Sequence, residues 1–272
     1  SSILSLKHEL NSGEKFYPQF QKHHIYEGGV NEKFYDNVNF GEVRKLDSSG
    51  LKYCNPNAHL EAGADFGKMT CMIIGQKQGW SQRILKNFHT LAPKFVQELA
   101  QDFVEFFVHH KRKYLKLYHD RSANQNASIG KDFATELKRL IEGAEINGVR
   151  QGWKVELMSV GQGTIYQFED FNVVNQIFSE NNPKLPKILI DHLQCMELIS
   201  SLNMAKIIVK LNKQGVNQIH KNKTSEALPL KSLPMKSTNY SDAFKYYFCR
   251  KEYMSEVKTT GGTSYSYAPV VH

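Results

Sequence analysis

Apolar residues follow two different spacings along this chain, and each spacing predicts its own kind of element. Two short apolar runs at 59–65 and 69–76 flank a Gly-containing turn, which is typical of a β-hairpin, and 83–89 is a plausible third strand. From 93 to 113, apolar residues recur every three to four positions, which predicts a helix. The same patterns predict strands at 114–119, 153–158 and 187–191, and helices at 131–142, 165–180, 195–211 and 242–253.

The remaining stretches of the chain lack such regular spacing. Residues 1–58 are polar and aromatic, and we interpret them as an extended arm or linker that packs on the main domain. Residues 59–254 form that predicted domain, and residues 255–272 form a C-terminal tail. Within the domain, 214–239 reads as a long lysine-bearing loop, and loops of such length are usually functional or mobile.

The order of these elements predicts an α/β fold with a mixed sheet flanked by helices. Three antiparallel strands open the sheet, and the later strands follow helical crossovers, which are right-handed in nearly all proteins. That rule places the later, parallel strands beside the first strand, so 59–65 and 114–119 are expected to be parallel neighbours. Asp65 and Asp120 would then lie together at the carboxyl ends of these two strands.

These two carboxylates are the main candidates for chemistry. Ligands of open α/β sheets collect at this edge, and two like charges held close together favour a bound divalent cation. Asp242 opens the last predicted helix, and it completes the cluster if that helix packs across the two strands. Two divalent ions held there would clamp the attacking water and the leaving oxygen of a phosphodiester. Ordinary alternatives remain, since Asp242 could cap its helix and Asp120 could serve in a turn.

The chain carries a net charge of +8, and the distribution of this charge indicates a partner. Residues 205–260 contain ten Lys, one Arg and four acidic residues, a local excess of +7. A basic segment of this kind suits a polyanion such as nucleic acid, although solvated loop lysines are a common alternative. The predicted contacts to DNA phosphate are Lys68, Arg121, Lys221, Lys223, Lys231, Lys236 and Lys245.

Composition excludes several other classes of protein. The chain has 40% hydrophobic and 11% aromatic residues, which argues against a long disordered tail. Its longest apolar runs fall far short of the ~20 residues that a membrane-spanning helix needs. Its four cysteines are scattered without a CxxC pair, so they predict neither a zinc site nor a disulfide framework.

Three short segments carry a resemblance to a known family. They are Ala62-Gly-Ala-Asp65-Phe-Gly, Leu117-Tyr-His-Asp120-Arg-Ser and Thr238-Asn-Tyr-Ser-Asp242. Through them, residues 59–253 resemble the C-terminal nuclease domain of the tailed-bacteriophage terminase large subunit, which belongs to the ribonuclease H-like superfamily. The segment 120–138, followed by 152–155, is the most specific part of this resemblance.

The resemblance implies a ribonuclease H-like fold and a metal-dependent endonuclease, with Asp65, Asp120 and Asp242 as catalytic metal ligands. It implies cutting of concatemeric double-stranded DNA with two Mg²⁺ or Mn²⁺ ions, in the cytoplasm of the bacterial host. It also implies a portal protein, a small terminase subunit and a preceding ATPase domain as partners, and no membrane. The nearest match to an ATPase phosphate loop, 62–70, departs from that motif at two positions.

Two alternative functions stay open at this point. A junction resolvase of the same fold would use the same carboxylates but would cut branched DNA. A non-catalytic module that binds DNA or the portal would keep the aspartates for structural reasons only. Loss of metal-dependent cleavage on replacement of Asp120 would exclude the non-catalytic module.

Overall fold

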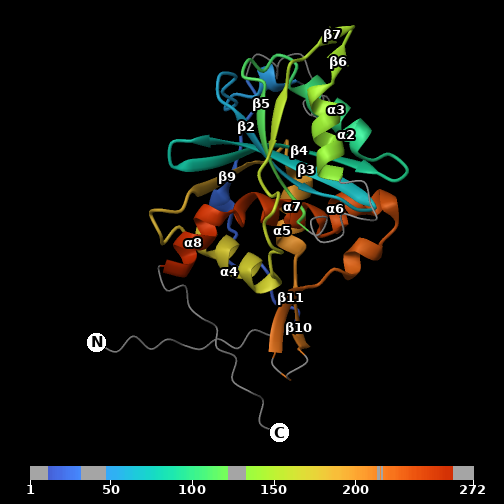
Figure 1. Cartoon of the computed structure of the whole chain (residues 1–272). Coiled ribbons are helices and arrows are strands. Elements are labelled where there is room, and N and C mark those ends of the chain that lie inside the picture. The colour runs from blue at the N-terminus through green and yellow to red at the C-terminus, as the bar shows by residue number, and fades with distance from the viewer. Residues whose placement is uncertain (1–11, 32–46, 122–132, 213–214, 216, 260–272) are drawn as a thin grey trace.

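One mixed sheet forms the centre of the computed structural model, which describes residues 12–31, 47–121, 133–212, 215 and 217–259 (Figure 1). The strands are β1 (Ile25–Tyr26), β2 (Leu60–Asp65), β3 (Met69–Gln78), β4 (Ser81–Leu91), β5 (Tyr114–His119), β8 (Lys154–Leu157) and β9 (Lys187–Asp191). Their order across the sheet is β1-β9-β4-β3-β2-β5-β8. The strands β2, β3 and β4 pair antiparallel, whereas β5, β8 and β9 join in parallel. The predicted mixed α/β sheet is therefore confirmed.

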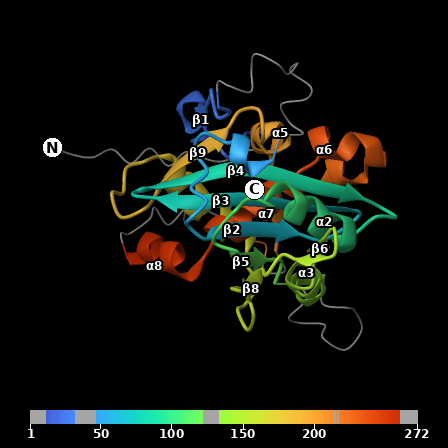
Figure 2. The same cartoon turned by 90° about the horizontal axis from the view of Figure 1, so that it is seen from above.

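Helices cover both faces of this sheet (Figures 1 and 2). One face carries α2 (Val96–Phe106) and α3 (Phe133–Glu142), and the other carries α4 (Gln167–Phe178), α5 (Met196–Met204), α7 (Asn239–Phe248) and α8 (Lys251–Thr259). Successive side chains of a strand point to opposite faces. In β2, Leu60, Ala62 and Ala64 therefore pack into the α2–α3 core, which leaves the alternate positions facing α7.

The arm before β2 is part of the packed structure. Phe16 and Tyr17 are buried in the core beside α4 and α7, and the short helix η1 (Lys22–His24) follows them. The strand β1 then pairs in parallel with β9 at the edge of the sheet. The short helix η3 (Ser48–Gly50) lies closer to β2. The described part of the predicted linker thus adds an edge strand and apolar side chains to the domain.

The structure corrects the prediction of one long helix at 195–211. There α5 ends at Met204, and the chain continues as strand β10 (Ile207–Leu211). Within the predicted loop, β11 (Asn217–Lys221) pairs antiparallel with β10. Three consecutive β-branched residues begin β10, and such residues favour strands. The rest of that loop contains η5 (Thr224–Ala227), η6 (Leu230–Ser232) and the short helix α6 (Leu233–Lys236).

Two further predictions about chain path were wrong. The helix expected at 242–253 is split into α7 and α8, because Arg250 turns inward between them and binds Glu61 of β2. The last parallel strand, β9, lies beside β4 and not on the β5 side of the sheet. There it covers the otherwise open edge of β4, which removes an unpaired strand edge. A small hairpin of β6 (Glu145–Ile146) and β7 (Val149–Arg150) was not predicted.

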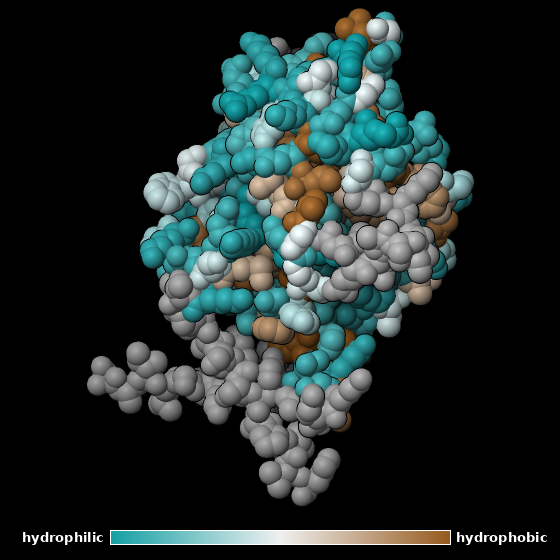
Figure 3. Space-filling view, in the orientation of Figure 1, coloured by the Kyte–Doolittle hydropathy of each residue, from teal (hydrophilic) through white to brown (hydrophobic). Residues whose placement is uncertain are grey.

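The outer surface is largely polar on the face shown in Figure 3, with small separated hydrophobic patches. Among the described residues, no helix combines the length and apolarity that crossing a bilayer requires. Residues 122–132, which carry part of the family resemblance, lie outside the described residues, as do 260–272 of the predicted tail.

Candidate metal centre

Asp65 and Asp120 lie at the ends of two adjacent parallel strands. In the β2–β5 register, Ala64 pairs with His119, and the N–H of Asp120 donates to the carbonyl oxygen of Ala64 at 3.2 Å. Asp65 is the last residue of β2, and Asp120 is the first residue after β5. The predicted neighbourhood of these two residues is therefore confirmed, and Asp65 is only 8% exposed.

The helix α7 brings Asp242 to the same end of the sheet. It lies directly on β2, and a Cβ on Gly63 would overlap the carbonyl oxygen of Ala243 and come within 2.9 Å of the Cβ of Tyr247. A glycine at this position thus permits the close approach of helix and strand. In the first turn of α7, Asn239 donates from Nδ2 to Oδ2 of Asp65 at 3.4 Å.

Three lysines surround the buried carboxylate of Asp242. Its Oδ1 accepts from Nζ of Lys221 at 3.0 Å and from Nζ of Lys245 at 3.4 Å, while Lys223 binds Oδ2. Lys221 also contacts Asp170 of α4 at 3.0 Å, and Asp170 accepts from the hydroxyl of Tyr17 at 3.0 Å. The N-cap position of α7 is held by Thr238, so Asp242 does not cap the helix.

The charges around Asp65 and Asp242 affect the two carboxyl groups in opposite directions. Burial would raise the pKa of Asp242, but the ammonium groups of Lys221, Lys245 and Lys223 outweigh it and hold that pKa well below its usual range. Burial raises the pKa of Asp65, and the negative charge of Asp242 adds to this rise. Asp120 contributes to it as well. At Asp242 the lysines thus outweigh burial, whereas at Asp65 burial and the neighbouring acids outweigh the opposing charges of Lys245 and Lys223.

Asp65 interacts electrostatically with both Asp120 and Asp242. The oxygens of the three carboxylates do not, however, lie close enough together to hold one ion. Across the described ranges, one trio of His, Cys, Asp or Glu ligand atoms lies within 4.8 Å of each other, and it comprises His23, His24 and Glu180. Both ring nitrogens of His24 already face backbone partners, Gln21 and Phe178, so this trio is a poor metal site. Joint binding of an ion by the aspartates therefore requires a movement of side chains.

The donor atoms at this end of the sheet fit a hard divalent cation. Carboxylate and amide oxygens are the ligands that Mg²⁺ and Mn²⁺ prefer. Asn239 is buried, and its Oδ1 has no hydrogen-bond partner in the described part of the chain, which makes it an available oxygen ligand next to Asp65. Asn239 and Asp242 are three residues apart and therefore share one face of α7.

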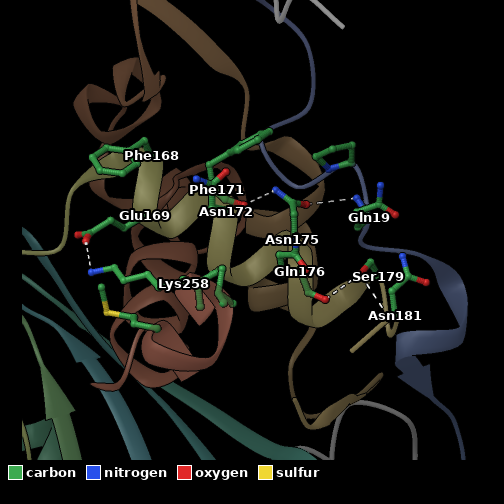
Figure 4. Close-up of a pocket in the computed structure, with 14 residues that line it drawn as sticks. Gln19, Phe168, Glu169, Phe171, Asn172, Asn175, Gln176, Ser179, Asn181 and Lys258 are labelled. Atoms are coloured by element: carbon green, nitrogen blue, oxygen red, sulfur yellow. Dashed lines mark hydrogen bonds and ion pairs between the residues drawn. The ribbon is translucent and has the colours of Figure 1, made fainter. Parts of the chain in front are cut away.

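A separate pocket of about 320 Å³ lies between α4, α8 and residues 18–19 (Figure 4). Several of its polar side chains bind one another or the backbone: Asn175 accepts from the N–H of Gln19, and Lys258 approaches Glu169 at 3.8 Å. The aspartate cluster does not line this pocket. The aspartate cluster at the end of β2 and β5 therefore lies apart from this pocket.

Comparison with known proteins identifies the fold. No family model and no curated protein matches the sequence. The large terminase of a thermophilic bacteriophage matches with a TM-score of 0.50 and 15% identity, over 88% of this chain and 45% of that chain. The chain shares its fold with the matched part of that large terminase. The predicted α/β fold class, a mixed sheet flanked by helices, is confirmed by this match.

Two further solved structures are similar. The same thermophilic-phage terminase in complex with ATP-γ-S matches with a TM-score of 0.50 and 15% identity, over 89% of this chain and 46% of that chain. The nuclease domain of g2p, the large terminase of bacteriophage SPP1, with bound Mn, matches with a TM-score of 0.41 and 14% identity, over 85% of this chain and 96% of that chain. This chain thus spans about half the length of the thermophilic-phage terminase.

The predicted DNA-contacting residues divide into exposed and buried groups. Lys68, Lys231 and Lys236 are exposed, and Lys223 is partly exposed. The other three, which are Lys221, Lys245 and Arg121, are buried. Arg121 donates to the carbonyl oxygens of Gly163 and Cys249, and the two lysines bind Asp242. In this arrangement the buried three are placed for internal contacts and not for DNA, which corrects the prediction.

Sequence analysis also missed several polar residues of the cluster. The hydroxyl of Tyr246 hydrogen bonds to Asp120, and Asp170 binds the buried Lys221. Asn239 was detectable in principle, because it stands one helical turn before Asp242. Tyr246 was detectable in the same way, because it stands one helical turn after Asp242. Asp170 gave no such signal, since its partner Lys221 is distant in sequence.

Proposed function

We propose that this chain is a metal-dependent endodeoxyribonuclease of a viral DNA-packaging terminase, which cuts concatemeric double-stranded DNA. The observation that carries the proposal is the convergence of three aspartates, from β2, β5 and α7, at one edge of the sheet. The raised pKa of Asp65 supports it, because burial and neighbouring negative charge leave this carboxyl group in need of a cation. The fold shared with the thermophilic-phage terminase is consistent with it.

In this proposal Asp65, Asp120 and Asp242 hold two Mg²⁺ or Mn²⁺ ions. Such ions, when bound, lower the pKa of a water and stabilise charge on the leaving oxygen of the phosphodiester. The Asp65 carboxyl group interacts electrostatically with both other acids, so Asp65 would be the ligand common to the ions, and Asn239 would supply an amide oxygen beside it. Tyr246 fixes the orientation of the Asp120 carboxylate through its hydroxyl group.

The exposed lysines at this end of the molecule bind the DNA backbone. Lys68 lies in the turn directly after β2, and Lys236 ends α6 just before α7. Contacts from such residues to phosphate give affinity without sequence information. We therefore expect cleavage with little dependence on base sequence.

The proposal extends to the rest of the terminase. The similar thermophilic-phage protein is about twice as long as the matched region and binds ATP-γ-S. We infer that an ATPase domain accompanies this domain in a full-length chain, and that a portal protein and a small terminase subunit are partners. The work of this complex would take place in the cytoplasm of the bacterial host.

The Asp120→Asn variant tests the proposal. It keeps the size of the side chain but removes one carboxylate, so we expect plasmid cleavage with Mn²⁺ to fall by about 100-fold or more. Asp102→Asn, on the exposed face of α2, is the matched control and should cleave like the wild type. Unchanged metal-dependent cleavage by Asp120→Asn would refute the proposal. A preference of the wild type for branched over plain duplex DNA would indicate a junction resolvase instead.

A further inference from the structure

Both oxygens of the Asp242 carboxylate are engaged with ammonium groups. Oδ1 faces Lys221 and Lys245, and Oδ2 faces Lys223. A carboxylate in this state has little capacity left for a divalent ion, because each cation competes for the same oxygens. If Asp242 is to bind an ion, at least one of these ammonium groups has to leave.

The three lysines differ in their freedom to move. The side chains of Lys221 and Lys245 are 0% and 5% exposed, whereas that of Lys223 is 43% exposed. Lys221 is also fixed from its other side by Asp170 at 3.0 Å. Displacing a fully buried ammonium group is costly because the interior offers no water to replace its partner. Lys223 is therefore the cation that can leave Asp242.

A second carboxylate, that of Glu226, lies close enough to Lys223 to bind its ammonium group after release from Asp242. Nζ of Lys223 lies 3.4 Å from Oε1 of Glu226, in the turn η5. That same Oε1 accepts from the hydroxyl of Thr238 at 2.7 Å, which fixes Glu226 next to the start of α7. One ammonium group is thus shared between Asp242 and Glu226, and a small side-chain movement transfers it fully to Glu226.

We propose that Lys223 is a positioning residue that exchanges from Asp242 to Glu226 when a divalent ion binds. The inference rests on the proposed function, because it assumes that Asp242 is a metal ligand. A divalent ion repels the ammonium group and takes over Oδ2, while Glu226 keeps that group paired. Lys223 then holds the Asp242 carboxylate in place before the ion binds. Glu226 lowers the free energy needed to release Lys223 from Asp242.

Mn²⁺ binding to the 272-residue chain, measured by titration calorimetry, tests this exchange. Lys223→Met removes the competing cation and keeps the apolar stem, so we expect about tenfold tighter binding. Glu226→Gln removes the alternative partner and should weaken binding several-fold. Lys94→Met, at an exposed lysine with no assigned role, is the control for the loss of one positive charge and should change the affinity little. Thermal unfolding of each variant shows whether the fold is retained.

The double variant Lys223→Met/Glu226→Gln distinguishes exchange from simple charge effects. If Glu226 acts only through its own negative charge, its replacement weakens binding equally with or without Lys223. If Glu226 acts by receiving Lys223, the double variant binds Mn²⁺ as tightly as Lys223→Met alone. An additive result, or unchanged or weaker binding by Lys223→Met, would overturn the inference.

Asp120→Asn separates this inference from the proposed function. If the wild type binds Mn²⁺ and Asp120→Asn does not, the aspartates form the metal site. The variants at Lys223 and Glu226 then test whether Lys223 exchanges between Asp242 and Glu226. If the wild type binds no Mn²⁺, or if Asp120→Asn binds it normally, the proposed site fails and the exchange fails with it.

Discussion

A buried carboxylate is costly unless cations or hydrogen-bond donors surround it, and β2 carries two buried carboxylates on its α7 face. Glu61 meets Arg250 at 3.0 Å. Burial would raise the pKa of Glu61, but the guanidinium of Arg250 outweighs it and lowers this pKa below its usual value. At Asp65, burial raises the pKa of the carboxyl group, and the negative charge of Asp242 adds to this rise. Glu61 thus contributes to stability through its ion pair, whereas the ligand role of Asp65 belongs to the proposed function.

Replacement of Glu61 by Gln should destabilise the protein by about 3 kcal/mol, because it leaves the buried Arg250 without its buried acidic partner. Since the pKa of Glu61 is lower in the folded than in the unfolded protein, its contribution is fully present above about pH 4.5 and is lost as the pH falls through the folded value. Urea unfolding at pH 7 and pH 3 measures both effects.

Glu252→Gln is the matched control for that prediction. Glu252 is the exposed partner of the same arginine, at 3.6 Å, and its replacement should cost well under 1 kcal/mol. Equal stability of the two variants at pH 7 would contradict the structural role of Glu61. A difference between wild type and Glu61→Gln that stays constant down to pH 3 would contradict the role of its ionisation.

At the scale of residues, the sequence predicted the acids and not their partners. Asp65 and Asp120 were found because adjacent parallel strands end at one edge, a rule that needs no side-chain detail. Sequence alone could not predict that three of the basic residues, Lys221, Lys245 and Arg121, are buried. The local sequence does not distinguish a basic side chain that binds DNA from one that is buried inside the protein. The pairing of Glu61 with Arg250 joins residues 189 positions apart, and no local pattern indicates it.

At the scale of elements, the contact between β2 and α7 sets the position of Asp242. The strand contains Ala62, Gly63 and Ala64, and the helix backbone lies against the middle residue. A larger side chain at that point would move the first turn of α7 away from the end of β2. Gly63 therefore helps to set the position of Asp242 relative to the end of β2.

We expect Gly63→Ala to destabilise the protein by about 1–3 kcal/mol and to weaken Mn²⁺ binding, because its methyl group overlaps the carbonyl of Ala243. Gly67→Ala is the control, since the nearest atom to its added Cβ, the carbonyl oxygen of Met69, lies at an ordinary 3.8 Å. Urea unfolding and Mn²⁺ titration of both variants check the prediction. Equal affinity in the two variants would show that α7 is not positioned by this contact.

The elements that were predicted correctly are those with a strong local period. The strand at 114–119 and the strand at 187–191 appear with the predicted bounds. The helix expected at 195–211 failed because its apolar residues suit a helix and a strand equally over so short a run. There the pairing of β10 with β11 decides the conformation, and that partner lies beyond the segment itself.

At the scale of the whole molecule, the exposed lysines lie at both ends of the sheet, and only one end carries the aspartates. Lys68 follows β2 at the aspartate end, together with Lys231 and Lys236 before α7. Lys77 is near the opposite end of β3, and Lys187 donates from its backbone N–H to Trp80 in the β3–β4 turn. Lys184 is near Lys187 in the chain and is also exposed. The two groups therefore offer a test of where DNA binds.

Two triple variants, each of which lowers the net charge from +8 to +5, separate local contacts from overall charge. Lys68, Lys231 and Lys236 are replaced by Gln in one, and Lys77, Lys184 and Lys187 in the other. Binding to duplex DNA without divalent ions is measured against salt concentration. Each lost phosphate contact should reduce the slope of log affinity against log salt by about 0.9, so the first variant should lose up to about 3 and the second almost nothing. If both slopes fall equally, DNA responds to the total charge, and the aspartate end of the sheet is not its binding site.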